Sequence, residues 1–129
     1  MRKRDRIAIL KGMHSRLSRP GGWVQGAFRR PRVDKNGKHF VAFCLAGAAQ
    51  DAAYERGIYR PVGDGNIVRE LGIDALALAK LAETSPRKAA LHDDGYAGSP
   101  TMGYNDYSRT RKRDIIALVN EALAKEGVV

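Results

Sequence analysis

The stretch from Ala42 to Arg56 reads AFCLAGAAQDAAYER, and its alanines decide the expected fold. Its small side chains recur at helical spacing and predict a helix that a neighbouring helix can approach closely. Gly57 follows as a natural helix stop. The members of this predicted stripe are Cys44, Leu45, Ala48, Ala49, Ala52 and Ala53.

Further helices are expected on both sides of this segment. Residues 2–18 form an amphipathic pattern with Ile7, Leu10, His14 and Leu17 on one face and Met13 beside them, ended by Pro20, Gly21 and Gly22. Residues 67–71 and 74–83 follow as helix, broken at Gly72, with Leu71, Ala75, Leu78 and Ala82 as the expected buried stripe. A last helix is expected from Thr110 to Lys125, with Thr110 or Ser108 as its N-cap.

The remaining segments predict a hairpin and loops. Short runs with valines and aromatic residues flank Asn36-Gly37, a strong tight-turn signal, so a β-hairpin is expected within residues 23–43. Residues 60–66 and 84–109 read as loops because proline, glycine and aspartate punctuate them. The expected fold class is mainly α, with α+β as the alternative: four to five helices around the alanine-rich central helix, and a short hairpin after the first helix.

Length and composition indicate one domain over residues 1–129. A chain of 129 residues with 43% hydrophobic and 29% charged residues has the make-up of an ordinary globular protein. Its one cysteine, Cys44, cannot form an internal disulfide, and no apolar run approaches the length of a membrane span. We therefore expect a cytoplasmic protein with no membrane association.

The positive charge is concentrated at the start of the chain. The net charge is +9, and residues 1–40 contain twelve basic residues but only two acidic ones, Asp5 and Asp34. Such asymmetry predicts a polyanionic partner: nucleic acid, a phosphate-bearing ligand or an acidic protein surface. A merely solvated surface is the alternative.

Two local clusters sharpen this expectation. Arg29, Arg30 and Arg32 follow Trp23 and Phe28, a combination that suits phosphate contact and base stacking, although Trp23 itself is expected in the core. Arg111, Lys112 and Arg113 stand at the start of the last helix, where a bound anion would offset their unfavourable placement. The candidate nucleic-acid or anion-binding residues are Arg2, Arg4, Arg29, Arg30, Arg32, Arg109, Arg111, Lys112 and Arg113.

Catalytic and metal sites have little support in the sequence. Cys44 has no histidine at a recognisable spacing among His14, His39 and His92, and the surrounding VAFCLAGA predicts a buried cysteine. One cysteine and three scattered histidines lack metal-ligand spacing, so neither a metal nor a cofactor is expected. We expect no enzyme, and name no catalytic residue.

Several short motifs occur in order along the chain. They are Trp23-Val24-Gln25-Gly26-Ala27, Cys44-Leu45-Ala46-Gly47-Ala48, Asn105-Asp106 and Arg109-Thr110. The set resembles an uncharacterised family of small bacterial and phage proteins. That resemblance implies a shared fold, and it suggests that Gln25, Asn105 and Asp106 line a shared pocket, but it implies no reaction.

Three functions are therefore kept open. The first is a non-enzymatic basic protein that binds nucleic acid or a complex containing it, by shape and charge. The second is a small phage-type inhibitor that binds an acidic surface of a host defence protein. The third is a pocket for a phosphorylated small molecule, with Arg109 and Gln25 in it. The sequence leaves the oligomeric state open.

Overall fold

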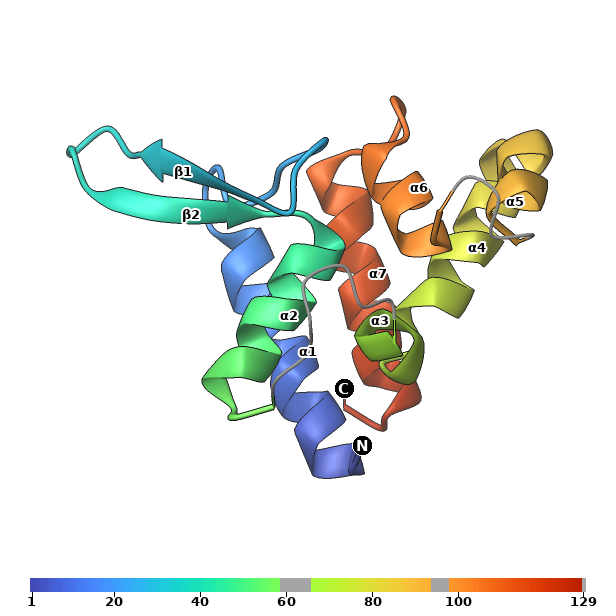
Figure 1. Cartoon of the computed structure of the whole chain (residues 1–129), viewed down its shortest axis with the longest axis horizontal. Helices are drawn as coiled ribbons and strands as arrows, with labels where there is room; N and C mark the ends of the chain where they lie inside the picture. The colour runs from blue at the N-terminus through green and yellow to red at the C-terminus, as the bar shows by residue number, and fades with distance from the viewer. Residues whose placement is uncertain (59–65, 94–97, 129) are drawn as a thin grey trace.

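The computed structural model describes residues 1–58, 66–93 and 98–128, and in them a helical body carries one projecting β-hairpin (Figure 1). The mainly helical class and the hairpin after the first helix are confirmed, but the described residues contain seven helices rather than four or five. None of these helices is long and apolar enough to cross a membrane. In chain order the elements are α1 (Lys3–Ser18), β1 (Arg29–Val33), β2 (His39–Phe43), α2 (Leu45–Glu55), α3 (Asn66–Glu70), α4 (Ile73–Thr84), α5 (Pro86–Asp93), α6 (Pro100–Asp106) and α7 (Lys112–Lys125).

Helix α1 lies between α2 and α7 and supplies much of the core. Its fully buried side chains are Ile9, Leu10, Met13 and Leu17, while Ile7 and His14 of the expected face are only half-buried. Close packing on α2 is confirmed, because a Cβ added at Gly12 would lie 3.0 Å from the Ala52 Cβ. The helices do not all gather around the alanine-rich α2, because α5 packs mainly on α4.

Helix α2 begins later than the alanine pattern predicted. Ala42 and Phe43 belong to β2, where they pair with Arg30 and Arg29, and Cys44 is the N-cap of the helix. The pattern missed this boundary because Ala42 and Phe43 are apolar and buried, so they continue the apolar pattern of the helix that follows. The predicted stop is confirmed, since Gly57 has a φ of 83° that suits glycine.

The hairpin forms around the turn that the sequence indicated. Strands β1 and β2 are antiparallel, with Arg29 opposite Phe43 and Val33 opposite His39. The Asp34 carboxylate accepts hydrogen bonds from the backbone N–H groups of Asn36 (2.8 Å) and Lys38 (2.9 Å). These bonds lower the pKa of Asp34 and hold the turn closed.

The break between α3 and α4 is confirmed at Gly72, whose φ is 79°. The expected buried stripe of α4 is wrong beyond Leu71: Ala75 and Ala82 are exposed and Leu78 is half-buried. Ile73, Leu76, Ala77 and Leu81 are buried instead, because they are the face that meets the other helices. A helix rich in alanine and leucine has apolar residues on every face, so the periodicity of the sequence alone does not predict which face of α4 is buried. Of the loop expected at residues 60–66, all but Asn66, the first residue of α3, lies outside the described residues.

The expectation of a long loop over residues 84–109 is wrong. It contains α5 and α6, each of which has proline as its first residue and a serine directly before it: Ser85-Pro86 and Ser99-Pro100. The Ser99 Oγ accepts the Met102 N–H at 3.2 Å. Proline fits the first helical position because its missing N–H is not needed there. The predicted caps of α7 are also wrong, since Arg111 is the N-cap and its N–H donates to the Asp114 carboxylate at 2.8 Å.

Candidate functional site

The buried side chain of Asn105, 1% exposed, joins three segments that are far apart in the sequence. Its Oδ1 accepts hydrogen bonds from Trp23 Nε1 (2.8 Å) and from the Leu45 backbone N–H (3.0 Å). Its Nδ2 donates to the Val24 carbonyl at 3.1 Å and to Asp106 Oδ1 at 3.0 Å. Leu45 is the first residue of α2, so Asn105 satisfies a helix-end N–H that has no partner within the helix.

Gln25 and Asp106 extend this network to the surface. Gln25 Nε2 donates to the carbonyls of Asn105 and Tyr107, both at 3.0 Å, and the Gly26 N–H donates to Asp106 Oδ1 at 3.0 Å. We call Trp23, Gln25, Gly26, Asn105 and Asp106 the motif junction. The structure thus brings the three predicted pocket residues together, as members of one hydrogen-bonded network.

The space beside the motif junction is very small. A cavity of about 10 Å³ lies between Ala27, Cys44, Ala46, Met102, Asn105 and Asp106. That volume is about the minimum for one water molecule and far below that of a phosphorylated metabolite. Arg109, the other residue expected in such a pocket, is exposed and lines a separate hollow beside Tyr104 and Asp114.

Two glycines in or beside the motifs allow the backbone to approach neighbouring segments closely. A Cβ at Gly47 would lie 2.0 Å from the Phe28 carbonyl oxygen, and one at Gly22 would lie 2.2 Å from the Arg16 carbonyl oxygen. Cys44, directly before α2, is buried as expected, with 4% exposed. Its Sγ accepts the Gly47 N–H at 3.3 Å. Burial nevertheless has the larger effect and raises the pKa of the thiol, so a neutral buried thiol caps α2.

Ion pairs neutralise part of the positive charge of α1. Arg6 Nε lies 2.6 Å from Glu126 Oε1, and this contact lowers the pKa of Glu126. Arg16 Nε lies 2.8 Å from Asp51 Oδ2, and Arg16 also pairs with Glu55. Asp5, one of the two acidic residues of the first forty, pairs with Arg56 at 2.9 Å.

A second group of cations gathers where the hairpin meets the ends of α1 and α7. Arg19, at the end of α1, stacks over the Phe40 ring at 3.9 Å and lies 3.8 Å from Asp34. Its carbonyl accepts a hydrogen bond from Lys112 Nζ, and the partial burial of Lys112 lowers the pKa of that amine. We call the hairpin together with these two helix ends the hairpin end; its basic residues are Arg19, Arg30, Arg32, Lys35, Lys38, Arg111, Lys112 and Arg113, of which Lys35 and Lys38 lie in the projecting turn.

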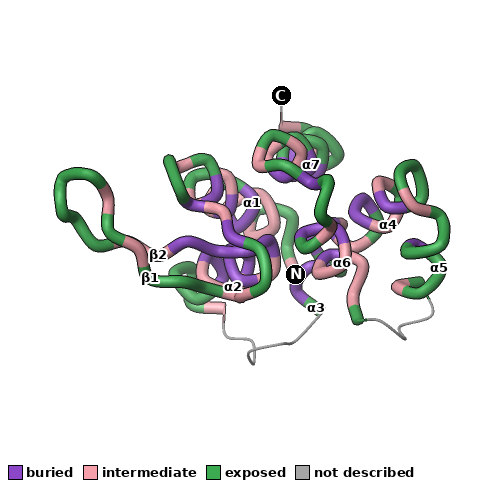
Figure 2. The backbone as a smooth tube through the Cα atoms, turned by 90° about the horizontal axis from the view of Figure 1, so that it is seen from above, coloured by how far each residue is buried: buried purple, intermediate pink, exposed green. Residues whose placement is uncertain are grey.

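Few carboxylates oppose the hairpin end. Asp34 is engaged by the turn and by Arg19, and Asp114 by the Arg111 N–H. Within the described ranges, no carboxylate forms an ion pair within 4.0 Å with the side chain of Arg30, Lys35 or Lys38, all of which are exposed. The hairpin projects away from the helical body, and residues 35–38 of its turn are exposed (Figure 2).

The predicted binding residues therefore divide into separate groups. Arg30, Arg32, Arg111, Lys112 and Arg113 lie at the hairpin end, with Arg29 at its border. Arg2 and Arg4 lie at the other end of α1, which is about 24 Å long because each helical residue adds about 1.5 Å. A single ligand bound at the hairpin end would therefore not reach Arg2 and Arg4.

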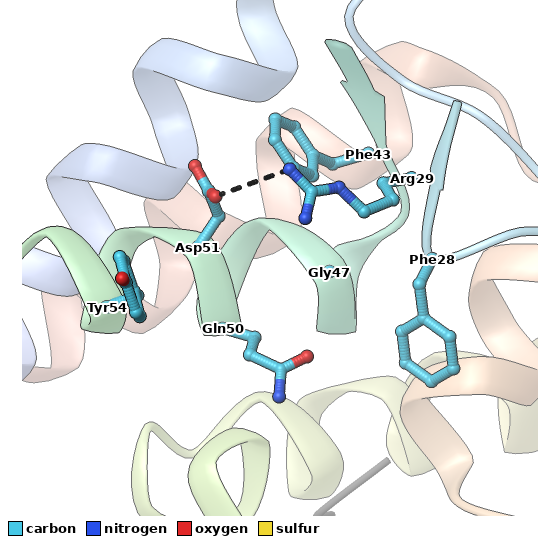
Figure 3. A pocket seen from close by; sticks show the side chains of 7 residues that line it. All are labelled: Phe28, Arg29, Phe43, Gly47, Gln50, Asp51 and Tyr54. Atoms are coloured by element: carbon cyan, nitrogen blue, oxygen red, sulfur yellow. Dashed lines mark ion pairs between the residues drawn. The ribbon is translucent and has the colours of Figure 1, made fainter. Parts of the chain in front are cut away.

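A groove opens beside the hairpin end on the outer face of α2 (Figure 3). It has a volume of about 440 Å³ and is lined by Phe28, Arg29, Phe43, Gly47, Gln50, Asp51 and Tyr54. We call it the α2 groove. The guanidinium of Arg29 lies 5.9 Å from the Phe43 ring centroid and 4.0 Å from Asp51 Oδ1. The groove is open to solvent, and 64% of Tyr54 is exposed.

Sequence reasoning missed the α2 groove. Gly47, Gln50, Asp51 and Tyr54 follow the i, i+3, i+4, i+7 spacing of one helix face, opposite the alanine stripe. That spacing was the sequence signal that could have identified this face of α2. No metal-binding group of three histidine, cysteine or acidic side chains occurs within the described part of the chain.

The fold and these surfaces define a small helical domain with a basic hairpin and a buried network that connects its sequence motifs. Residues 1–125 match the family of unknown function DUF6197, and the chain belongs to this family. The resemblance to an uncharacterised family is thereby confirmed. No curated protein and no solved structure matches the chain.

Proposed function

We propose that the protein is a non-enzymatic binding protein that engages the phosphate backbone of nucleic acid with its hairpin end. The single observation that carries this proposal is the row of basic side chains that runs along the hairpin and continues over Arg19, which stacks on Phe40, to Lys112 at the start of α7. Among the described residues, the carboxylates of Asp34 and Asp114 beside this row are already engaged. Phosphate contacts of lysine and arginine supply most of the affinity in sequence-independent binding.

The position of the cations supports this function over a merely solvated surface. Apart from Phe43, which also pairs with Trp23, the hairpin extends outside the helical core. The exposed side chains of Arg30, Lys35 and Lys38 are not part of that core. A two-stranded ribbon of this width can follow a nucleic-acid groove or backbone. The start of α7 adds backbone N–H groups beside Arg111 and Arg113.

The test compares two double variants that remove equal charge. Arg30→Ala/Lys38→Ala changes the hairpin end, and Arg2→Ala/Arg4→Ala changes the far end of α1. We expect binding to random-sequence DNA or RNA at about 50 mM salt, a loss of about tenfold for the hairpin variant, and a salt slope shallower by about 2. The Arg2→Ala/Arg4→Ala control is expected to stay within about threefold, because each lost distant charge acts only through a screened field.

Two results would reject the proposal. One is the absence of any binding at about 50 mM salt, where phosphate contacts are strongest. The other is an equal loss in both double variants, which would indicate attraction by net charge alone. A stoichiometric host protein complex that survives nuclease treatment would instead favour the inhibitor function, since an acidic protein surface would use the same cations.

A further inference from the structure

We infer that the α2 groove holds an unpaired nucleobase, so that the nucleic acid bound at the hairpin end is single-stranded. The inference rests on the proposed function and adds that the bound nucleic acid is single-stranded rather than a duplex. It starts from the lining of the groove, in which Phe28 and Tyr54 border an open space of about 440 Å³, while Phe43 is buried at its base beneath the Arg29 guanidinium. Aromatic rings beside a cationic track are the usual platform for single-stranded nucleic acid, because every base has a stacking face.

The backbone fixes one wall of the groove. The Phe28 carbonyl accepts the Cys44 N–H at 3.2 Å and lies where a Gly47 side chain would otherwise stand. Phe28 is thereby held against the first turn of α2, and Figure 3 shows its ring across from Gln50, with Tyr54 on the other side. Gly47 and Tyr54 are seven residues apart, about 10 Å along the helix, which leaves room for a planar base between the walls.

The charges of the groove also suit a nucleotide. Asp51 would repel a phosphate, but its carboxylate faces Arg16 at 2.8 Å and Arg29 at 4.0 Å, so it is neutralised. Arg29 stands at the border between the groove and the hairpin end, and its side chain is 65% exposed. A strand with one base in the groove can place the adjoining phosphate on Arg29, whose side chain lies on the groove side of β1.

The experiment measures the binding of a single strand of about 15 nucleotides and of the duplex of the same sequence, by fluorescence anisotropy. A 2-aminopurine base within the strand reports stacking through the quenching of its emission. We expect the single strand to bind about tenfold more tightly than the duplex, with quenching on binding. Tyr54→Ala is expected to remove most of this difference and leave duplex affinity unchanged.

Leu91→Ala is the matched control, because Leu91 is also an exposed apolar side chain (43% exposed) but lies on α5. A thermal unfolding curve verifies that both variants fold. If Tyr54→Ala leaves the affinity for the single strand unchanged, or if single strand and duplex bind equally, the inference is wrong while the proposed function stands. If neither binds, the proposed function fails as well. If the groove instead takes an aromatic side chain of a protein partner, Tyr54→Ala weakens that complex and leaves both nucleic acids unaffected, which also overturns the inference.

Discussion

Replacement of Asn105 by alanine tests whether the family motifs are structural. The substitution removes an amide that is 1% exposed and leaves three groups without their partner: Trp23 Nε1–H, the Leu45 N–H and the Val24 carbonyl. An unsatisfied buried polar group costs about 1–3 kcal/mol. Since Trp23 is only half-buried, its N–H falls at the lower end of this range. The three costs sum to about 3–7 kcal/mol. Because single substitutions rarely cost more than about 5 kcal/mol, we expect the free energy of unfolding to fall by about 3–5 kcal/mol.

Urea denaturation followed by far-ultraviolet circular dichroism measures this loss. Helical signal is the better probe, because Trp23 loses its own partner in the variant and its fluorescence would change without unfolding. Asn120→Ala is the matched control, since Asn120 is exposed on α7. This control is expected to stay within about 0.5 kcal/mol of the parent. A loss below about 1 kcal/mol for Asn105→Ala would mean that water or neighbouring groups replace the amide, and the argument for a structural junction would be refuted.

Two more predictions follow from the first turn of α2. Gly47→Ala would place a Cβ 2.0 Å from the Phe28 carbonyl oxygen. This clash is expected to cost about 2 kcal/mol or more in urea denaturation, and an unchanged midpoint would contradict the fixed position of Phe28. The Cys44 thiol, which is 4% exposed and has its pKa raised by burial, is expected to react with an aromatic disulfide reagent only as fast as the protein unfolds. Rapid labelling under native conditions would contradict this, and the same reagent in urea supplies the positive control.

The sequence predicted the elements whose signals are local. The amphipathic α1, the turn at Asn36-Gly37 and the stop at Gly57 depend on spacing or backbone conformation within a few residues, and all three are confirmed. Ser85-Pro86 and Ser99-Pro100 were misinterpreted, because a serine-proline pair begins a helix as readily as it makes a loop. The buried face of α4 could not be chosen, since Leu78 and Leu81 are equally apolar and only the packing partner distinguishes them.

The site depends on contacts between distant segments. The composition showed that the excess positive charge lies in the first forty residues. It placed Arg2 and Arg30 in one candidate site, although α1 separates them in the structure. Pairing of Arg6 with Glu126 and of Arg16 with Asp51 could not be read from a net charge. The motif set indicated convergence on Asn105 and Asp106, yet whether convergence makes a cavity or a closed network depends on side-chain packing.

The long sequence separation within the motif junction has a consequence for how the protein is made. Trp23 and Gln25 hydrogen-bond to groups about 80 residues later in the chain, and α1 packs on the last helix. At a synthesis rate of about 5–20 residues per second, the N-terminal segment waits for about 4–16 seconds before its partners exist. During that interval the face of α1 that packs on α7 has no partner, so the nascent chain exposes apolar side chains within a highly basic segment. Folding of the whole domain is therefore expected to begin only after α7 has left the ribosome.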